Sequence, residues 1–309
     1  MKIFFKMLTA AALTTAASGC SSFLDINTNP NSPTAVTPDQ ILATALSTTA
    51  QNYTGGTPSA QNAYNGYASW VASYWGRAGG VSGYGEEITY NYSSTFYNAL
   101  FDNSYDNLND YQLIQNQAAT YPNHAAIARI MKVYNYLLLV DEFGDVPYTQ
   151  ALLGAANTTP VYDKAADIYK DLLVQLTGAI TDINAVPASG RTVGGEDIVF
   201  AGNMTNWKRL ANSLKLRILM RESQTGDATL NASIATQMTA LQTATDGFIQ
   251  TDVVAQPGYA QNTNQQNPLY NRFAFTVAGT GATERSYQLP TQYIIACSRL
   301  LLQMPKQTT

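Results

Sequence analysis

Charged residues are scarce in this chain of 309 residues, because Lys, Arg, Asp and Glu together make up only 12% of it. An average soluble domain carries about 25%. The formal net charge is −4 and no run of Lys or Arg occurs, so the electrostatic footprint of a nucleic-acid-binding protein is missing. We therefore expect no nucleic-acid partner, and a surface made of amide, hydroxyl and tyrosine groups.

Cysteine and histidine are scarcer still: Cys20, Cys297 and His124 are the only ones in the chain. This scarcity excludes a Cys/His zinc cluster and a disulfide framework. His124 stands at a predicted helix start, where we expect an ordinary first-turn residue without a catalytic role. The acids of residues 141–145 lack the alternating spacing of a calcium loop. We expect no metal and no cofactor.

Long apolar runs are also absent, apart from a short one near the N-terminus. Lys2 and Lys6 are followed by an uncharged run over residues 7–17, which is too short to span a bilayer and is typical of a secretion signal. The sequence Ala-Ser-Gly then precedes Cys20, which looks like the lipobox of a bacterial lipoprotein. We therefore expect a lipoprotein signal peptide over 1–19, lipidation at Cys20, and attachment to the membrane through this anchor alone.

Residues 20–36 resemble an extended tether, since they are rich in Asn, Ser, Thr and Pro and follow no helical or alternating period. Helical patterning begins at Thr37, which forms a capping-box signature with Pro38 and Gln40. We therefore divide the mature chain into a lipidated tether over 20–36 and a domain over 37–309.

Apolar residues recur at helical spacing along most of this domain. The pattern predicts helices over 38–53, 60–76, 95–118, 123–142, 163–184, 207–222 and 229–243. The fourth is apolar on most of its surface and should be nearly surrounded. Asp163 and Asn206 are the expected N-caps of the fifth and sixth. Residues 246–290 have no helical period, and strand-like runs are few, so the fold class is mainly all-α. Helices in consecutive pairs favour a stacked helix-pair superhelix.

Three motifs follow one another in a characteristic order. Phe-Leu-Asp-Ile-Asn-Thr-Asn-Pro-Asn stands at 23–31, Leu-Val-Asp-Glu-Phe-Gly-Asp-Val-Pro-Tyr at 139–148, and Trp-Lys-Arg-Leu-Ala-Asn-Ser-Leu-Lys-Leu-Arg at 207–217. Together with the lipobox, they resemble the SusD/RagB-like outer-membrane lipoproteins of the Bacteroidetes. The resemblance covers about 20–295. It implies an all-α superhelix of tetratricopeptide-like helix pairs that carries irregular ligand-binding loops.

The resemblance also implies a function and a partner. It implies a non-catalytic lipoprotein at the outer membrane, facing the cell exterior, that captures oligosaccharides and delivers them to a SusC-like TonB-dependent transporter. Some members bind peptides, so the ligand itself is not identified. Members usually continue well past this length, so we expect the domain over 37–309 to be incomplete at its C-terminus.

Candidate ligand-binding residues come from the chemistry of sugars, because no family motif transfers them to this chain. Sugars have apolar C–H faces and rims of hydroxyl groups, which flat aromatic, amide and Arg side chains bind. These side chains are densest around a Gly-rich loop after the second predicted helix, where we expect exposed loop aromatics to form a stacking platform. The candidates are Trp75, Arg77, Tyr84, Tyr90 and Asn91.

Alternatives stay open at these positions. Trp70, Tyr74 and Trp75 stand at helical spacing and could belong to the core instead. A second candidate site is the loop 256–271 with Tyr259, although a loop of this composition could equally be solvated without binding anything.

Two other functions also stay open. Glu86, Glu87 and other acids could supply the carboxylate pair of a lipid-anchored glycan hydrolase. A helical solenoid could instead be a protein-binding scaffold, with a broad concave surface and no affinity for small ligands.

Overall fold

Helices dominate the computed structural model, which describes residues 36–55 and 63–303, with side chains up to 299. The expected signal peptide over 1–19, Cys20 and the first motif over 23–31 lie outside the described residues. The mainly all-α fold class is confirmed. The elements are α2 (Pro38–Thr54), α3 (Tyr64–Val71), β1 (Trp75–Arg77), α4 (Gly85–Thr89), α5 (Asn98–Gln115), α6 (Pro122–Phe143), β2 (Val146–Pro147), η2 (Gly154–Ala156), β3 (Tyr162–Asp163), α7 (Ala165–Ala185), α8 (Met204–Glu222), α9 (Ala228–Gln242), α10 (Pro268–Phe273), η3 (Thr283–Ser286), β4 (Gln288–Pro290) and α11 (Gln292–Gln303).

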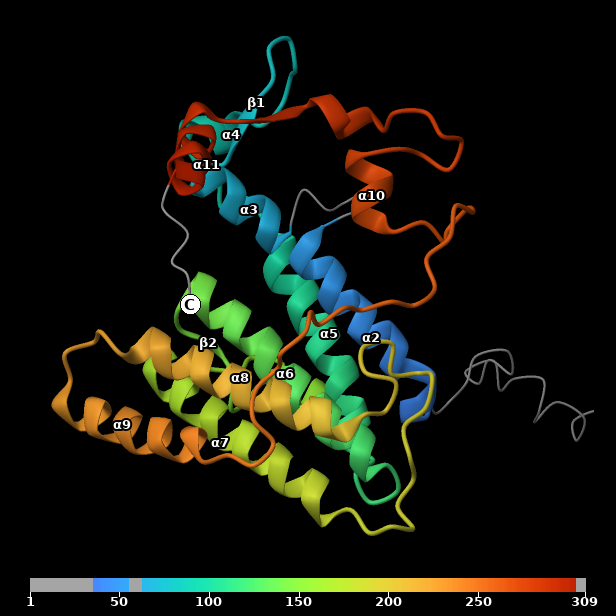
Figure 1. Cartoon of the computed structure of the whole chain (residues 1–309), viewed down its shortest axis with the longest axis vertical. Coiled ribbons are helices and arrows are strands. Elements are labelled where there is room, and N and C mark those ends of the chain that lie inside the picture. Colours follow the sequence, from blue (N-terminus) through green and yellow to red (C-terminus); the bar gives the residue numbers. More distant parts are fainter. Residues whose placement is uncertain (1–35, 56–62, 304–309) are drawn as a thin grey trace, which may run out of the picture. The chain divides into compact units, whose positions relative to one another are not determined.

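Consecutive long helices pack against one another (Figure 1). α2 packs against α5, α5 against α6, α6 against α7, α7 against α8, and α8 against α9. Each new helix therefore covers the apolar face of its predecessor, which is how stacked helix pairs build a continuous core. This order agrees with the expected helix-pair architecture.

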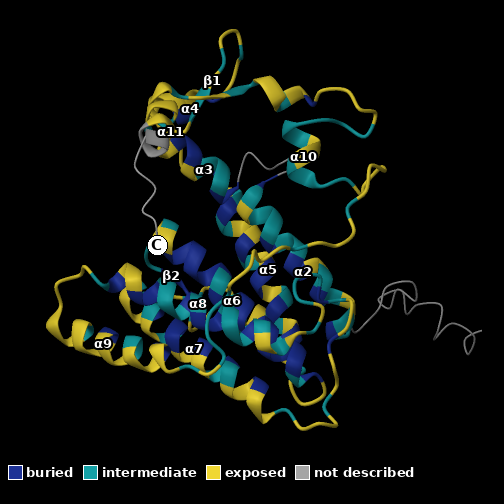
Figure 2. Cartoon of the chain, viewed as in Figure 1, coloured by how far each residue is buried: buried dark blue, intermediate teal, exposed yellow. Residues whose placement is uncertain are grey.

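The core is centred on α6, which contacts α2, α5, α7 and α8. Of its 22 residues, 15 are buried, because Ala, Ile, Leu and Val side chains occur on all its sides. Figure 2 shows buried residues concentrated along α6 and on the sides of its neighbours. The helix is surrounded, as its composition predicts.

The second family motif ends α6 and starts a short strand pair. Gly144 follows the helix with φ +73°, a conformation that L side chains rarely adopt, and its N–H donates to the Val140 carbonyl at 3.0 Å. β2 then pairs antiparallel with β3, with Val146 opposite Asp163. The motif therefore reverses the chain between α6 and α7.

The predicted N-cap of α7 is wrong, because Asp163 lies in β3 and bonds elsewhere. Its Oδ2 accepts from the N–H groups of Tyr148 at 3.0 Å and Thr149 at 2.9 Å. The free N–H of Ala165 donates instead to Asp145 Oδ1 at 2.9 Å. Asp163 of β3 thus accepts from the backbone N–H groups that follow β2, and Asp145, which precedes β2, accepts from the backbone N–H at the start of α7.

The predicted N-cap of α8 is also wrong by three residues. The helix begins at Met204, and Asn203 is the N-cap, with its side chain accepting from the Asn206 N–H at 3.1 Å. Both positions carry Asn, so local preference alone does not choose between them.

The second predicted helix is shorter than the expected 60–76, and residues 56–62 lie outside the described ones. α3 ends at Val71, Ser73 adopts φ 57°, and Trp75 begins β1. β1 pairs antiparallel with β4, with Trp75 opposite Pro290. The strand partner comes from a distant part of the chain, so helical spacing could not reveal it.

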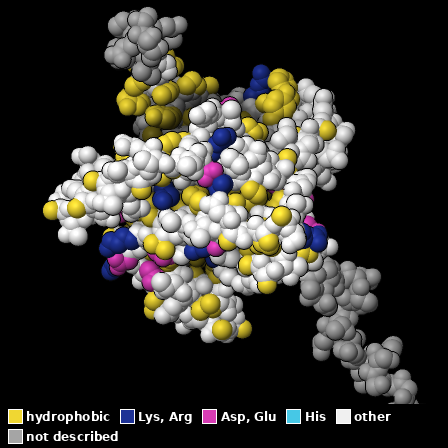
Figure 3. Space-filling model, turned by 60° about the horizontal axis from the view of Figure 1, so that its bottom comes forward, with side chains coloured by type: hydrophobic (Ala, Val, Ile, Leu, Met, Phe, Trp, Pro, Cys, Tyr) yellow, Lys and Arg dark blue, Asp and Glu magenta, His cyan; other side chains and the backbone are white. Residues whose placement is uncertain are grey.

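The face shown in Figure 3 has few charged side chains, and Lys and Arg lie interspersed with Asp and Glu among uncharged groups. The region 246–290 is largely irregular as expected, although it contains α10, η3 and β4.

Within the described ranges, no helix combines the length and apolar character that crossing a bilayer requires.

Candidate functional site

Three tyrosines of the segment 84–97 adopt a left-handed backbone conformation, with φ 53° at Tyr84, 54° at Tyr90 and 53° at Tyr97. Tyr84 and Tyr90 flank α4, and Tyr97 precedes α5. A non-glycine residue held in a sparsely populated conformation costs about 1–3 kcal/mol and persists only where its surroundings hold it there. Such positions cluster at functional sites, so this segment is the first candidate.

Tyr84 turns inward, so the expectation of an exposed stacking residue is wrong at this position. Its side chain is only 8% exposed and stacks on Trp70 with 4.9 Å between ring centroids. Its hydroxyl donates to Glu284 Oε2 at 3.4 Å and accepts from Gln288 Nε2 at 3.1 Å. Burial, together with the Glu284 charge, raises the pKa of Tyr84 to about 12. Tyr84 and Trp70 are therefore core residues.

Tyr90 turns outward and is 52% exposed. Its ring meets the edge of Tyr92 at 6.1 Å, and Tyr92, itself 40% exposed, stacks on Phe96 at 4.3 Å with 14° between the ring planes. Phe96 in turn packs on the buried Tyr97 at 4.5 Å. We call Tyr90, Tyr92 and Phe96 the aromatic ledge. Tyr92 and Phe96 were not among the predicted ligand-binding residues, although the density of aromatic residues after Tyr90 indicated this segment.

Polar groups surround the ledge without forming a paired-acid site. Asn91 is exposed between Tyr90 and Tyr92. Glu86 accepts from the Ser93 N–H at 2.7 Å, and hydrogen bonds from Ser93 lower the pKa of Glu86. Burial raises the pKa of Glu87.

The directions of these two acids weaken the hydrolase alternative. Adjacent side chains on a helix point about 100° apart, since an α-helix has 3.6 residues per turn. Glu86 and Glu87 therefore do not flank a common gap, which a pair of glycosidase carboxylates must do.

Trp75 and Arg77 lie on β1. Trp75 is half-buried and packs on Phe273 of α10, with 5.9 Å between ring centroids. Arg77 is exposed, and its Nη1 donates to the Gly83 carbonyl at 2.9 Å, across the glycine loop. Trp75 thus anchors α10, whereas Arg77 holds the loop that leads to α4.

Tyr259 lines a different cavity from Trp75 and Tyr84. This cavity measures about 600 Å³ and lies between α2, α8 and the segment 249–269. Leu, Val, Ala and Tyr side chains form most of its wall, with Arg217 as its charged residue. The six predicted ligand-binding residues are therefore divided between two regions.

His124 lies in the first turn of α6 as expected, fully buried, with Nε2 3.0 Å from Glu196 Oε1. Over 36–55 and 63–303, no three His, Cys, Asp or Glu side chains gather as metal ligands do.

Comparison with known proteins places these features in context. Residues 30–280 match the model of a SusD-like family described as "Starch-binding associating with outer membrane". No curated protein matches the chain.

Solved structures are similar over much of the chain. A SusD/RagB family protein from Bacteroides thetaiotaomicron is 25% identical, with a TM-score of 0.60 over 77% of this chain and 48% of its own. A chitin-binding protein is 28% identical, with a TM-score of 0.54 over 69% of this chain and 44% of its own. A chitin-binding SusD homologue from Flavobacterium johnsoniae, 23% identical with a TM-score of 0.56 over 67% and 43%, shows the same fold. The chain thus spans less than half the length of these relatives.

Proposed function

Since the chain belongs to the SusD-like family, we propose that it is a non-catalytic lipoprotein of the outer membrane that captures oligosaccharides at the cell surface. The observation that carries this proposal is the aromatic ledge. The exposed rings of Tyr90 and Tyr92 offer flat apolar faces on which the C–H face of a sugar stacks, and Asn91 offers a neighbouring amide for the hydroxyl rim.

Contacts within the protein hold the rings of the ledge in place. Tyr90 adopts a left-handed backbone conformation, and its hydroxyl lies 3.5 Å from the Val71 carbonyl oxygen. Tyr92 is held by its stacking on Phe96. A platform whose side chains are ordered in advance loses less conformational entropy on binding, so a modest stacking contact suffices.

Anchoring and delivery complete the proposed function. The lipobox before Cys20 supports a lipid anchor, and residues 20–36 supply a tether between the anchor and the domain. The family resemblance supports delivery of the captured ligand to a SusC-like TonB-dependent transporter. The ligand class rests on the aromatic and amide-rich surface and on the relatives named for chitin binding.

The decisive test is titration of the chain from Ser21 onward with oligosaccharides from starch and chitin and with oligopeptides. We choose Tyr90→Asn, because Asn tolerates the left-handed conformation and removes the aromatic ring with its hydroxyl. Loss of one stacking contact, about 1.4 kcal/mol, weakens binding of an intact oligosaccharide about tenfold. The matched control is Tyr162→Asn, which removes an exposed tyrosine from β3 and should leave binding unchanged.

Other outcomes would contradict the proposal. Equal loss of affinity in Tyr90→Asn and Tyr162→Asn would show that the ledge is not the binding site. Cleaved products in the same mixtures would indicate a hydrolase. Absence of binding by a folded sample would favour the scaffold alternative.

A further inference from the structure

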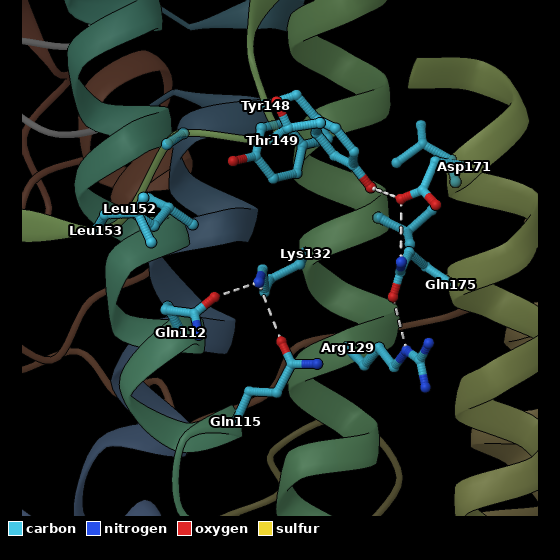
Figure 4. A pocket seen from close by; sticks show the side chains of 14 residues that line it. Gln112, Gln115, Arg129, Lys132, Tyr148, Thr149, Leu152, Leu153, Asp171 and Gln175 are labelled. Atoms are coloured by element: carbon cyan, nitrogen blue, oxygen red, sulfur yellow. Dashed lines mark hydrogen bonds between the residues drawn. The ribbon is translucent and has the colours of Figure 1, made fainter. Parts of the chain in front are cut away.

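A second pocket lies between α5, α6, α7 and the segment 148–153, and measures about 350 Å³ (Figure 4). This volume is at the small end of the range for ligand pockets, about 300–1,000 Å³. Arg129, Lys132 and Asp171 are the charged residues of its wall, and amide, tyrosine, threonine and aliphatic side chains supply the rest. We call it the lysine pocket.

Lys132 enters this pocket without an acidic partner. Its Nζ donates to Gln112 Oε1 at 2.5 Å and to Gln115 Oε1 at 3.0 Å, and it forms no ion pair within the part of the chain that the structure describes. Burial, together with the Arg129 charge, lowers the pKa of Lys132 to about 8. The two amide oxygens solvate the ammonium group only partly and leave its charge uncompensated.

Arg129 adds a second cation at the same side of α6. Its Nε donates to Gln175 Oε1 at 2.8 Å, and its Nη1 pairs with Asp182 Oδ2 at 2.8 Å. The guanidinium lies against the backbone of Gly178, since a Cβ built there would be 2.4 Å from Arg129 Cζ. Because glycine has no side chain, Gly178 of α7 leaves the space that the guanidinium of Arg129 occupies.

Asp171 does not neutralise Lys132. Its Oδ2 already accepts from the Tyr148 hydroxyl at 2.5 Å and from Gln175 Nε2 at 3.0 Å. Figure 4 shows these bonds continuing through Gln175 to Arg129, while Lys132 faces the two glutamines of α5. The pocket thus keeps one half-buried cation with no anion beside it.

We propose that the lysine pocket binds the carboxylate group of a small ligand, at a site separate from the aromatic ledge. A charge-assisted hydrogen bond from Lys132 to a carboxylate would compensate the buried ammonium, which no side chain of the pocket does. The wall also contains glutamine amides, the Asp171 carboxylate and the Tyr148 hydroxyl. These groups supply the donors and acceptors that hydroxyl or amide groups next to the carboxylate require. Such a carboxylate belongs to a sugar acid or to a short peptide.

The test titrates the full chain with glucuronic acid, with glucose as its uncharged counterpart, and with N-acetylglutamate as the peptide-type carboxylate. We expect glucuronic acid or N-acetylglutamate to bind at least tenfold more tightly than glucose. The acid that binds identifies the source of the carboxylate. Equal binding of glucose, or no binding of either acid, would overturn the proposal.

Lys132→Met removes the charge and keeps an unbranched stem, so the fold should survive. We expect it to weaken binding of the acid at least tenfold. The matched control is Lys215→Met on α8, because Lys215 is also half-buried and its pKa is also lowered by burial. Equal effects of the two variants would overturn the assignment to Lys132.

Gly178→Ala provides a second variant that should fold, since alanine favours a helix by about 1 kcal/mol over glycine. The new Cβ must displace the guanidinium of Arg129, so we expect weaker binding of the acid without loss of stability. Lys132→Met should leave binding of uncharged oligosaccharides at the ledge unchanged, because Lys132 lines a different pocket, and this separates the two sites.

Binding should also depend on pH. The titratable and charged groups around Lys132 are Arg129 and Tyr136 on α6, Tyr148 after β2, and Asp171 on α7, whereas α5 contributes only amides. Burial raises the pKa values of Tyr136 and Tyr148. Affinity for the acid should therefore fall as pH rises above about 8, where Lys132 loses its proton, and this fall should be absent in Lys132→Met. A fall of equal size in both proteins would contradict the role of Lys132.

Discussion

Asp197 shows how much one buried side chain can organise. Its Oδ1 accepts from the backbone N–H groups of Val199 at 3.0 Å and Phe200 at 3.1 Å. Its Oδ2 accepts from the Gly202 N–H at 2.9 Å and from Trp207 Nε1 at 2.8 Å. The turn before α8 is thus built around one carboxylate, which also satisfies the indole of the third family motif.

We predict that Asp197→Asn destabilises the protein by about 2–4 kcal/mol, because an amide N–H₂ replaces an acceptor and faces donors in a buried site. Urea denaturation monitored by tryptophan fluorescence measures the change. Asp167→Asn on the exposed face of α7 is the control and should change the free energy of unfolding by less than about 0.5 kcal/mol. A comparable small effect of Asp197→Asn would show that the carboxylate does not hold the turn.

Among the long helices, α9 has the least tertiary support. Only Ile234 and Leu241 of its residues are buried, and it packs chiefly on α8. Its start depends on Asp227, whose Oδ1 accepts from the Leu230 N–H at 2.9 Å. A helix with so little buried surface relies on its cap and opens locally more readily than the core.

We predict that Asp227→Ala speeds amide hydrogen exchange in α9 about fivefold, corresponding to loss of a cap worth about 1 kcal/mol. Amides of α6 should exchange as before, since local opening of α9 does not need the core to unfold. Asp252→Ala, in an exposed loop, is the control. Equal acceleration in α6 and α9 would show that α9 unfolds only with the whole domain.

At the scale of the whole molecule, a buried polar cluster joins three helices. Thr49 Oγ1 on α2 lies 2.8 Å from the Tyr111 hydroxyl and accepts from Asn107 Nδ2 at 2.8 Å, both on α5. Asn135 Nδ2 on α6 donates to the same oxygen at 3.1 Å. These polar atoms meet only when all three helices are in register, so the cluster specifies how the first helix pairs stack.

We predict that Thr49→Val destabilises the protein by about 1–3 kcal/mol, since it leaves buried hydrogen-bonding groups of α5 and α6 without this partner. Thr44→Val, at an exposed position of α2, is the control. The effects of Thr49→Val and Tyr111→Phe should be less than additive in thermal or urea unfolding. Full additivity would mean that the two hydroxyls do not act together.

Much of the helical architecture was predictable from local patterns. The apolar periodicity placed the long helices within a few residues, and the apolar circumference of α6 predicted its burial. The N-caps of α7 and α8 were not predictable, because the choice between Asp163 and Asp145, or between Asn206 and Asn203, depends on which backbone groups the fold brings near.

The candidate sites were less predictable than the helices. Tyr84 and Tyr90 have the same residue type and the same left-handed backbone, and no local pattern separates them. The sequence around Lys132 predicts only a buried helix. Its pocket also needs side chains of α5 and α7, which the pattern of one helix does not reveal.

The sequence by itself determined the elements whose causes are local: helix periodicity, the glycine stop after α6, and the motifs that mark the family. Only the tertiary structure decided which side chains are accessible. Tyr84 is covered because Glu284 and Gln288 reach it from a distant segment. The hydroxyl of Tyr90 contacts the Val71 carbonyl instead, and about half of this side chain stays exposed to solvent. Exposure depends on contacts between residues far apart in the chain, and a binding surface is defined by what those contacts leave uncovered.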